Sequence, residues 1–320
     1  MLLLPQIQEK VEVMHNFNIT RREIDFNGRK LIVETGKMAK QANGAVFVQY
    51  GETAVLCTAT MSKDAAPDQD FFPLTVDYIE KMYAAGKIPG GFFKRETKPS
   101  TDATLSARVI DRSIRPLFPD GFRNQVHVVY NVLAFDGEND ASALGVFAAS
   151  LALSISDIPF HGPIAGVTVG LIDDQLVVNP SLKDIDSKSK LNLAVAGSAT
   201  SVVMIESAAQ QLSEETMLDA VYTGHEAIKQ LCALQNEFVA ACGKEKVEVQ
   251  LVGIPEEIMN KVESGFGSRI AEAAVILGKQ ERQDAFDAAE NEMTEKFSSE
   301  DTEWLSCSVK LSASIFFSSA

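Results

Sequence analysis

The chain has 320 residues, of which 46% are hydrophobic, and this length and composition predict two domains with a sizeable core. The formal net charge of −15 means that most of the surface would repel a polyanion. No segment approaches the ~20 apolar residues of a membrane span, and the opening Met-Leu-Leu-Leu is too short for a signal peptide. The four cysteines form no Cys-x-x-Cys pair, so we expect no structural zinc site and a reduced, cytoplasmic setting.

Residues 20–60 predict consecutive β-hairpins. Asn27-Gly28 is a strong two-residue turn signal, and Gly51-Glu52 separates two further apolar runs. Cys57 lies inside the apolar run 54–59, and we expect it to be a small core residue.

The segment 81–123 concentrates positive charge. It holds nine Lys or Arg against four Asp or Glu, a local balance of +5, so the remainder of the chain carries −20. Such asymmetry predicts a bounded anion-binding surface. Within the segment, Pro89-Gly90-Gly91 marks a loop whose next residues suit single-stranded nucleic acid, because aromatic rings stack on bases and cations attract phosphates. These residues are Phe92, Phe93, Lys94 and Arg95.

A helix follows this loop, with Ser100 or Thr101 as its cap and Pro116 as its stop. Arginines recur in it at i, i+4 and i+7, which lie on one helical face, and a row of guanidiniums suits a phosphodiester backbone. These arginines are Arg108, Arg112 and Arg115. A structural alternative is open, because Asp111 has the spacing for intrahelical ion pairs with two of them. The two phenylalanines of the loop would equally fit a buried position.

The pattern from residue 126 to residue 242 predicts further strands and two long helices. The uncharged segment 141–156 has helical spacing, which indicates a helix buried on most sides, and a second helix is expected from Ser213 to Cys242. Strands are expected at 126–135, 167–172, 175–178, 191–196 and 202–205. Strands first and packed helices afterwards indicate an α+β domain.

Beyond Gly243 the pattern changes to short, highly charged helices, which we expect at 255–262, 268–277 and 280–297. We therefore place a domain boundary near residue 245. The predicted organisation is an N-terminal extension (1–16), an α+β domain (17–244), an all-helical domain (245–297) and an atypical tail (298–320).

Several motifs closely resemble the first half of the bacterial polynucleotide phosphorylase family, the polyribonucleotide nucleotidyltransferases. The motifs are FFPLTVDY at 71–78, YAAGKIPG at 83–90, FFKRE at 92–96, IDRSIRPLFP at 110–119 and GHE at 224–226. The resemblance covers roughly residues 17–297. It implies that 17–244 is the first RNase PH-like (ribosomal protein S5 domain 2-like) domain of that family and that 245–297 is its small all-α domain.

The resemblance also implies a function. Family members form ring-shaped trimers that degrade RNA from its 3′ end with inorganic phosphate and release nucleoside diphosphates in mRNA turnover. Mg²⁺ is the cofactor implied for the full-length enzyme, with RNA-degradation complexes as partners, a cytoplasmic location and no membrane. The loop 92–95 and the arginines between 108 and 115 match the family's RNA-holding loop and arginine-bearing helix.

Departures from the family pattern bear on catalysis. In the family, the phosphate pocket and the acidic metal-binding pair belong to a second core, which we do not expect in this chain. At the equivalent turn, residues 137–140 (Gly-Glu-Asn-Asp) present negative charge, which disfavours phosphate. At the equivalent carboxylate pair, Asp186 is accompanied by Asn192, which makes a poor Mg²⁺ site. We therefore expect an RNA-holding half without catalytic or metal-binding residues of its own.

The sequence leaves three functions to compare. The first is the RNA-binding part of a phosphorolytic 3′ to 5′ exoribonuclease, and the second is a non-catalytic RNA-binding or ring-forming scaffold subunit. The third, a small-molecule kinase, is disfavoured because the sequence has no Gly-rich Lys-Ser/Thr phosphate loop.

Overall fold

The computed structural model describes residues 18–67, 69, 71–91, 95–96, 98–252 and 256–298. The chain divides between Leu251 and Val252 into two compact units. The predicted extension 1–16, and the predicted tail apart from Ser298, lie outside the described residues.

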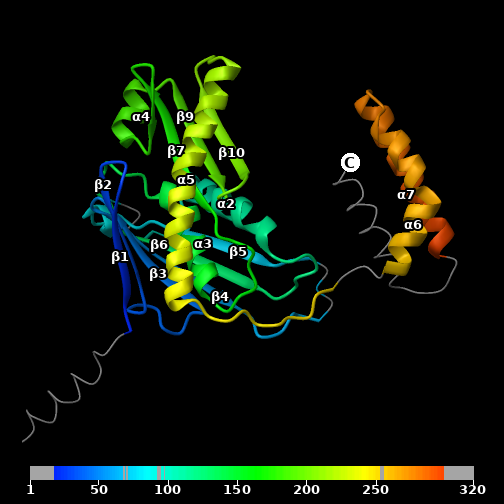
Figure 1. The fold of residues 1–320 in the computed structure, drawn as a ribbon, viewed down its shortest axis with the longest axis horizontal. Helices are drawn as coiled ribbons and strands as arrows, with labels where there is room; N and C mark the ends of the chain where they lie inside the picture. Colours follow the sequence, from blue (N-terminus) through cyan, green and yellow to red (C-terminus); the bar gives the residue numbers. More distant parts are fainter. Residues whose placement is uncertain are drawn as a thin grey trace, which may run out of the picture. The chain divides into compact units, whose positions relative to one another are not determined.

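A six-stranded sheet forms one half of the first unit (Figure 1). Its strands follow the order β1-β2-β3-β4-β6-β5, and all neighbours are antiparallel except the parallel pair β5 and β6. The bounds are β1 (Thr20–Phe26), β2 (Arg29–Thr35), β3 (Gly44–Tyr50), β4 (Thr53–Met61), β5 (Leu74–Ile79) and β6 (Val126–Ala134). The turn predicted at Asn27-Gly28 is confirmed, since both residues have the positive φ (51° and 74°) that a tight hairpin turn requires.

A four-stranded antiparallel sheet forms the other half, in the order β10-β9-β7-β8. The bounds are β7 (Ala165–Ile172), β8 (Gln175–Val178), β9 (Leu191–Gly197) and β10 (Val202–Ala209). β10 is four residues longer than the sequence predicts, while β5 and the short helix α4 (Leu182–Lys188) are additions to the predicted elements.

The helix α3 (Gly145–Ile155) is the centre of the first unit. All of its residues are buried, as its uncharged sequence predicts, and it packs against both sheets and against α2 (Thr101–Ile114) and α5 (Glu214–Cys242). The short η3 turn (Ser142–Leu144) leads into it. Gly44 permits a close approach to α3, because a Cβ there would lie 1.9 Å from the Ala152 carbonyl oxygen. Cys57 is fully buried in this core, as expected.

The strap that follows α5, residues 243–251, is bound to the C-terminal end of α3. The Lys246 ammonium donates to the carbonyls of Leu153 (2.9 Å), Ser154 (3.0 Å) and Ser156 (2.7 Å). A helix end leaves its last carbonyls short of intrahelical donors, and the Leu153 carbonyl also accepts from the Ser156 amide at 3.2 Å. Burial lowers the pKa of Lys246 to about 8, against the opposing attraction of Asp157.

The second unit contains two helices, α6 (Glu256–Ala274) and α7 (Lys279–Ser298). The prediction of separate helices at 255–262 and 268–277 is wrong, because α6 runs unbroken through Gly265 and Gly267. Each interior glycine costs a helix ~1 kcal/mol, but one face of α6 is buried and offsets that cost. The buried residues are Val262, Phe266, Ile270 and Ala273 on α6, with Ala289 and Met293 on α7.

Candidate nucleic-acid interface

α2 carries the arginines that the sequence singles out. Its first turn is capped by Ser100, whose hydroxyl accepts from the Ala103 amide at 2.9 Å, so the predicted cap is confirmed. Ile110 and Ile114 bury the opposite face of the helix. α2 ends at Ile114 and passes into the η2 turn (Arg115–Leu117), which contains Pro116. Burying one face leaves the arginines of the other face exposed.

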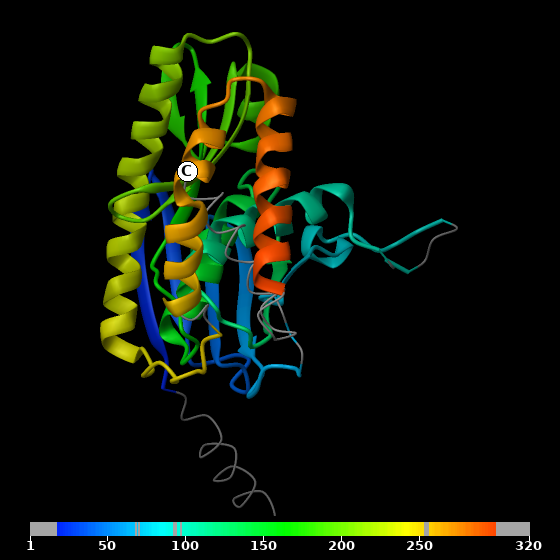
Figure 2. The same cartoon turned by 90° about the vertical axis from the view of Figure 1, so that its right-hand side faces the viewer.

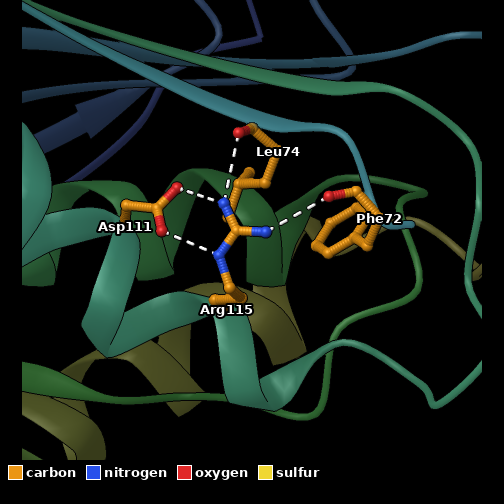
Figure 3. A network of polar contacts seen from close by, with 4 residues as sticks. All are labelled: Phe72, Leu74, Asp111 and Arg115. Atoms are coloured by element: carbon orange, nitrogen blue, oxygen red, sulfur yellow. Dashed lines mark hydrogen bonds and ion pairs between the residues drawn. The ribbon is translucent and has the colours of Figure 1, made fainter. Parts of the chain in front are cut away.

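Arg115 is held by the protein itself (Figure 3). Its guanidinium forms a two-pronged ion pair with Asp111, at 2.8 Å from Nε and 2.7 Å from Nη2. It also donates to the carbonyls of Phe72 (3.2 Å) and Leu74 (3.3 Å), and its Cζ lies 5.6 Å from the centre of the Phe72 ring. The structural alternative, an ion pair with Asp111, therefore holds for Arg115. The same side chain joins the end of α2 to the start of β5. Contact of Arg115 with RNA stays a prediction.

Arg112 and Arg108 face a cavity on the outer side of α2. Arg112 forms an ion pair with Glu206 of β10, in which both side chains are more than half exposed. Arg108 is exposed and has neither a hydrogen bond nor an ion pair to any other residue that the structure describes. Both arginines line a cavity of about 580 Å³, together with other residues of α2 that include Asp111, with Val76 of β5 and with Glu206 of β10. Guanidiniums so placed are available to an anion.

The predicted RNA-holding loop is described only in part. Phe92, Phe93 and Lys94 lie outside the described residues, and Arg95 is exposed. Figure 2 shows the described parts of this segment projecting from the two sheets, between the η1 turn (Met82–Ala85) and α2. A cavity of about 810 Å³ lies beside it, lined by apolar residues, by four cations and by the carboxylates of Glu80, Glu96 and Asp140. The cations are Lys81, Lys87, Arg95 and Lys98.

The turn at 136–142 has its own carboxylates where a phosphate would need free amides. Asp136 accepts from the Glu138 and Asn139 amides, each at 2.8 Å, and Asp140 accepts from the Ser142 amide at 2.8 Å. Burial alone would raise the pKa of Asp136, but the hydrogen bonds from Asn139, Glu138 and Thr53 outweigh it and hold the pKa at about 2. Three amides of this turn, those of Glu138, Asn139 and Ser142, are thus engaged by internal anions.

The predicted weak metal position does not gain further ligands from the fold. Asp186 lies exposed on α4, and Asn192 lies exposed on β9 between Gly170 of β7 and Ala208 of β10. Within the described ranges, no three His, Cys, Asp or Glu side chains are grouped to hold a metal ion. One carboxylate and one amide do not fit Mg²⁺, which prefers charged oxygen ligands.

The structure adds Glu206 and Phe72 to the residues that bear on this surface. Glu206 follows Arg112 by 94 residues, and Phe72 precedes Arg115 by 43. Helical spacing carries no information about partners at such separations. The sequence offered one signal, since Phe72 falls in the motif at 71–78 that resembles the family.

Comparison with known proteins relates this chain to a family. The model of the 3′ exoribonuclease family, domain 1, matches residues 27–159, and the model of domain 2 matches residues 162–227. The chain is 52% identical to a polyribonucleotide nucleotidyltransferase of Bacillus subtilis over 87% of its own length. It is 54% identical to that of Streptococcus pneumoniae over 84% of its length. It spans 39% and 36%, respectively, of the length of these relatives.

A solved structure, rice (Oryza sativa) Rrp46, shares the fold with a TM-score of 0.51 at 12% identity, covering 69% of this chain and 93% of that chain. This likeness agrees with the predicted α+β class. None of the described helices is long and apolar enough to cross a membrane. Since the two family models together match more than half of the sequence, the chain belongs to the 3′ exoribonuclease (RNase PH) family.

Proposed function

We propose that this chain is the RNA-holding portion of a phosphorolytic 3′ to 5′ exoribonuclease of the polyribonucleotide nucleotidyltransferase type. The observation that carries the proposal is the pair Arg108 and Arg112, exposed beside one cavity on an otherwise acidic chain. Arg108 has no partner among the described residues, and the exposed ion pair of Arg112 contributes only ~0–1 kcal/mol, so a phosphate can replace Glu206 at little cost.

The basic loop (residues 86–99) supplies the second part of the proposed RNA surface. Arg95 and Lys98 are exposed on it, and Phe92, Phe93 and Lys94 complete the predicted set. Stacking of bases on aromatic rings is tolerant of sequence, and cations bind the backbone of any strand. We therefore propose binding of single-stranded RNA without strong sequence preference.

The whole protein's activity is part of the proposal, because the chain spans about two fifths of its curated relatives. We propose that the longer protein degrades RNA with inorganic phosphate to nucleoside diphosphates, uses Mg²⁺, works in the cytoplasm and assembles as a trimer. Within this chain we propose an RNase PH-like domain over 17–244 and an all-helical domain over 245–297. No catalytic step is assigned to the described residues, because the amides of the 136–142 turn are engaged and Asp186 with Asn192 does not fit Mg²⁺.

The second candidate is a non-catalytic RNA-binding or ring-forming scaffold subunit. The 136–142 turn favours it, since Asp136 and Asp140 occupy donors that a phosphate would otherwise use. The identity of 52–54% to nucleotidyltransferases favours the enzyme.

The test is release of nucleoside diphosphates from poly(A) by the purified chain with phosphate and Mg²⁺, alongside a poly(A) binding titration. We expect binding without release, which places catalysis outside the described residues. Release that depends on both phosphate and Mg²⁺ would overturn our interpretation of Asp186 and Asn192. Absence of poly(A) binding at low salt would contradict the proposed function itself.

A further inference from the structure

The two ends of the basic loop (residues 86–99) are tied together by Glu96. Its carboxylate accepts from the Met82 amide at 2.7 Å, and its carbonyl accepts from the Lys81 ammonium at 3.1 Å. A second tie lies alongside, because the Ser100 hydroxyl that caps α2 also donates to the Glu80 carboxylate at 2.6 Å. The residues before the loop are thereby joined to the residues after it.

The turn that Glu96 contacts is fixed to the body of the first unit. Within η1 and its cap, the Gly86 amide donates to the Tyr83 carbonyl at 3.0 Å and the Lys87 amide to that of Met82 at 2.9 Å. The Phe135 amide at the end of β6 donates to the Ala84 carbonyl at 2.8 Å. Glu96 therefore joins the returning limb of the loop to a turn that is itself anchored to the six-stranded sheet.

Glu96 also lies in an unfavourable place for a carboxylate that served no purpose. It is half-buried, follows Arg95 directly and shares the wall of the 810 Å³ cavity with Lys87 and Lys98. By charge alone, it opposes the binding of a polyanion by these cations. The Glu96 carboxylate weakens the attraction of this surface for a polyanion. Its side chain and its backbone carbonyl nevertheless both bond to the chain before the loop, as expected of a residue that positions the loop.

We propose that Glu96 is a positioning residue for RNA binding, which holds the described cations beside it, Arg95 and Lys98, at the wall of the 810 Å³ cavity. This inference rests on the proposed function. Cations already held in place avoid the ordering cost that loosely held ones would meet on binding, ~0.5–1.5 kcal/mol per immobilised side chain. Glu96 acts through the loop and does not itself contact the phosphates.

The test uses two substitutions that remove the same charge but differ in the hydrogen bond, so that charge and positioning predict opposite outcomes for Glu96→Ala. Glu96→Gln keeps an oxygen that accepts from the Met82 amide, whereas Glu96→Ala removes it, and both remove the negative charge. We expect Glu96→Ala to weaken binding of a labelled oligo(A) by about three- to tenfold, the factor that one immobilised side chain represents. Glu96→Gln should bind as well as the unaltered chain or tighter.

Asp120→Ala is the matched control, because it removes one exposed carboxylate from the same basic segment without touching the loop. It should not weaken binding. The rate of limited trypsin cleavage after Lys87, Arg95 and Lys98 measures how firmly these residues are held in the absence of RNA. We expect faster cleavage in Glu96→Ala only.

Each result discriminates. Equal or tighter binding by both Glu96 variants, with unchanged cleavage, would overturn the positioning role and leave the proposed function standing. Failure of the unaltered chain to bind oligo(A) at low salt would remove the proposed function and this inference together.

Discussion

Arg112 and Arg115 lie within one turn of each other, yet their guanidiniums have different partners. Arg112 meets a single exposed carboxylate on β10, whereas Arg115 has Asp111, two backbone carbonyls and an aromatic ring. Helical spacing identified both as one row. What separates them is the chain around Phe72, whose carbonyl lies within reach of only one of the two.

Replacing each arginine by alanine should separate stability from RNA binding. Arg115→Ala should lower the free energy of unfolding by about 1–2 kcal/mol, since it removes a charged pair and two carbonyl contacts at a partly exposed site. Arg112→Ala should change it by less than ~0.5 kcal/mol. Urea titration of the two variants measures this difference, and equal losses would contradict it.

The same variants test which arginines contact RNA, through the salt dependence of binding. Arg112→Ala should flatten the plot of log affinity against log salt by about 0.7, the slope of one phosphate contact to a single strand. The same flattening in Arg115→Ala would confirm the predicted contact of Arg115 with RNA, whereas an unchanged slope would leave Arg115 a structural role alone. Binding titrations of oligo(A) at several salt concentrations check this, with Arg108→Ala as the matched exposed arginine.

Asp136 predicts a pH dependence of stability. Its folded pKa of about 2 lies below the ordinary value of 3.8, so its contribution is present above pH ~4 and is lost as the pH falls toward 2. Discounted for solvent screening at this partly exposed carboxyl, the contribution is about 1 kcal/mol. Asp136→Asn should reduce stability at pH 7 and remove this part of the acid dependence in urea titrations at pH 3 and pH 7. An unaltered difference between the two pH values would show that other carboxylates account for it.

Elements were predicted from sequence where one residue fixes the local backbone. Asn27-Gly28 and the Ser100 cap are such cases, since a positive φ or a free hydroxyl determines the turn or helix start. α6 was divided wrongly because Gly265 and Gly267 weaken a helix locally, and packing on α7 overrides them. The acidic turn was recognised from its charges. Its hydrogen bonds, and the ties of Glu96, could not be predicted because they depend on backbone positions brought together by the fold.

The strap 243–251 gives a prediction for α3. Lys246→Met keeps most of the aliphatic stem but removes the donor to three carbonyls at the helix end. We expect a loss of about 1–3 kcal/mol in the free energy of unfolding, because the Ser154 and Ser156 carbonyls lose this donor, whereas the Leu153 carbonyl keeps the Ser156 amide and hydroxyl. Lys244→Met is the control, because its ammonium meets one carbonyl, that of Asn43, at an exposed site. Thermal unfolding should show the smaller effect for Lys244→Met.

The whole chain divides at a different residue from the one that composition indicates. Sequence places the boundary near 245, where charge increases, whereas the compact units divide between Leu251 and Val252. The difference is the strap, whose Lys246 ammonium and Val247 amide both donate to the region just after α3. A chain ending at 251 should therefore keep the main unfolding transition. A chain ending at 244 should unfold at lower temperature by calorimetry, and equal transition temperatures would contradict the role of the strap.

The hydrogen bonds of the 136–142 turn determine which substitutions could let it bind an anion. Two of its three carboxylates, those of Asp136 and Asp140, are tethered beside the amides they occupy, so their local concentration far exceeds that of any phosphate in solution. Removing Asp136 frees the Glu138 and Asn139 amides but leaves Asp140 on Ser142 and its negative charge in place. Each single replacement loses stabilising bonds without creating an anion pocket. An anion pocket at this turn would need both replacements together, and the Glu138 carboxylate would still oppose the anion, so no one substitution can produce such a pocket.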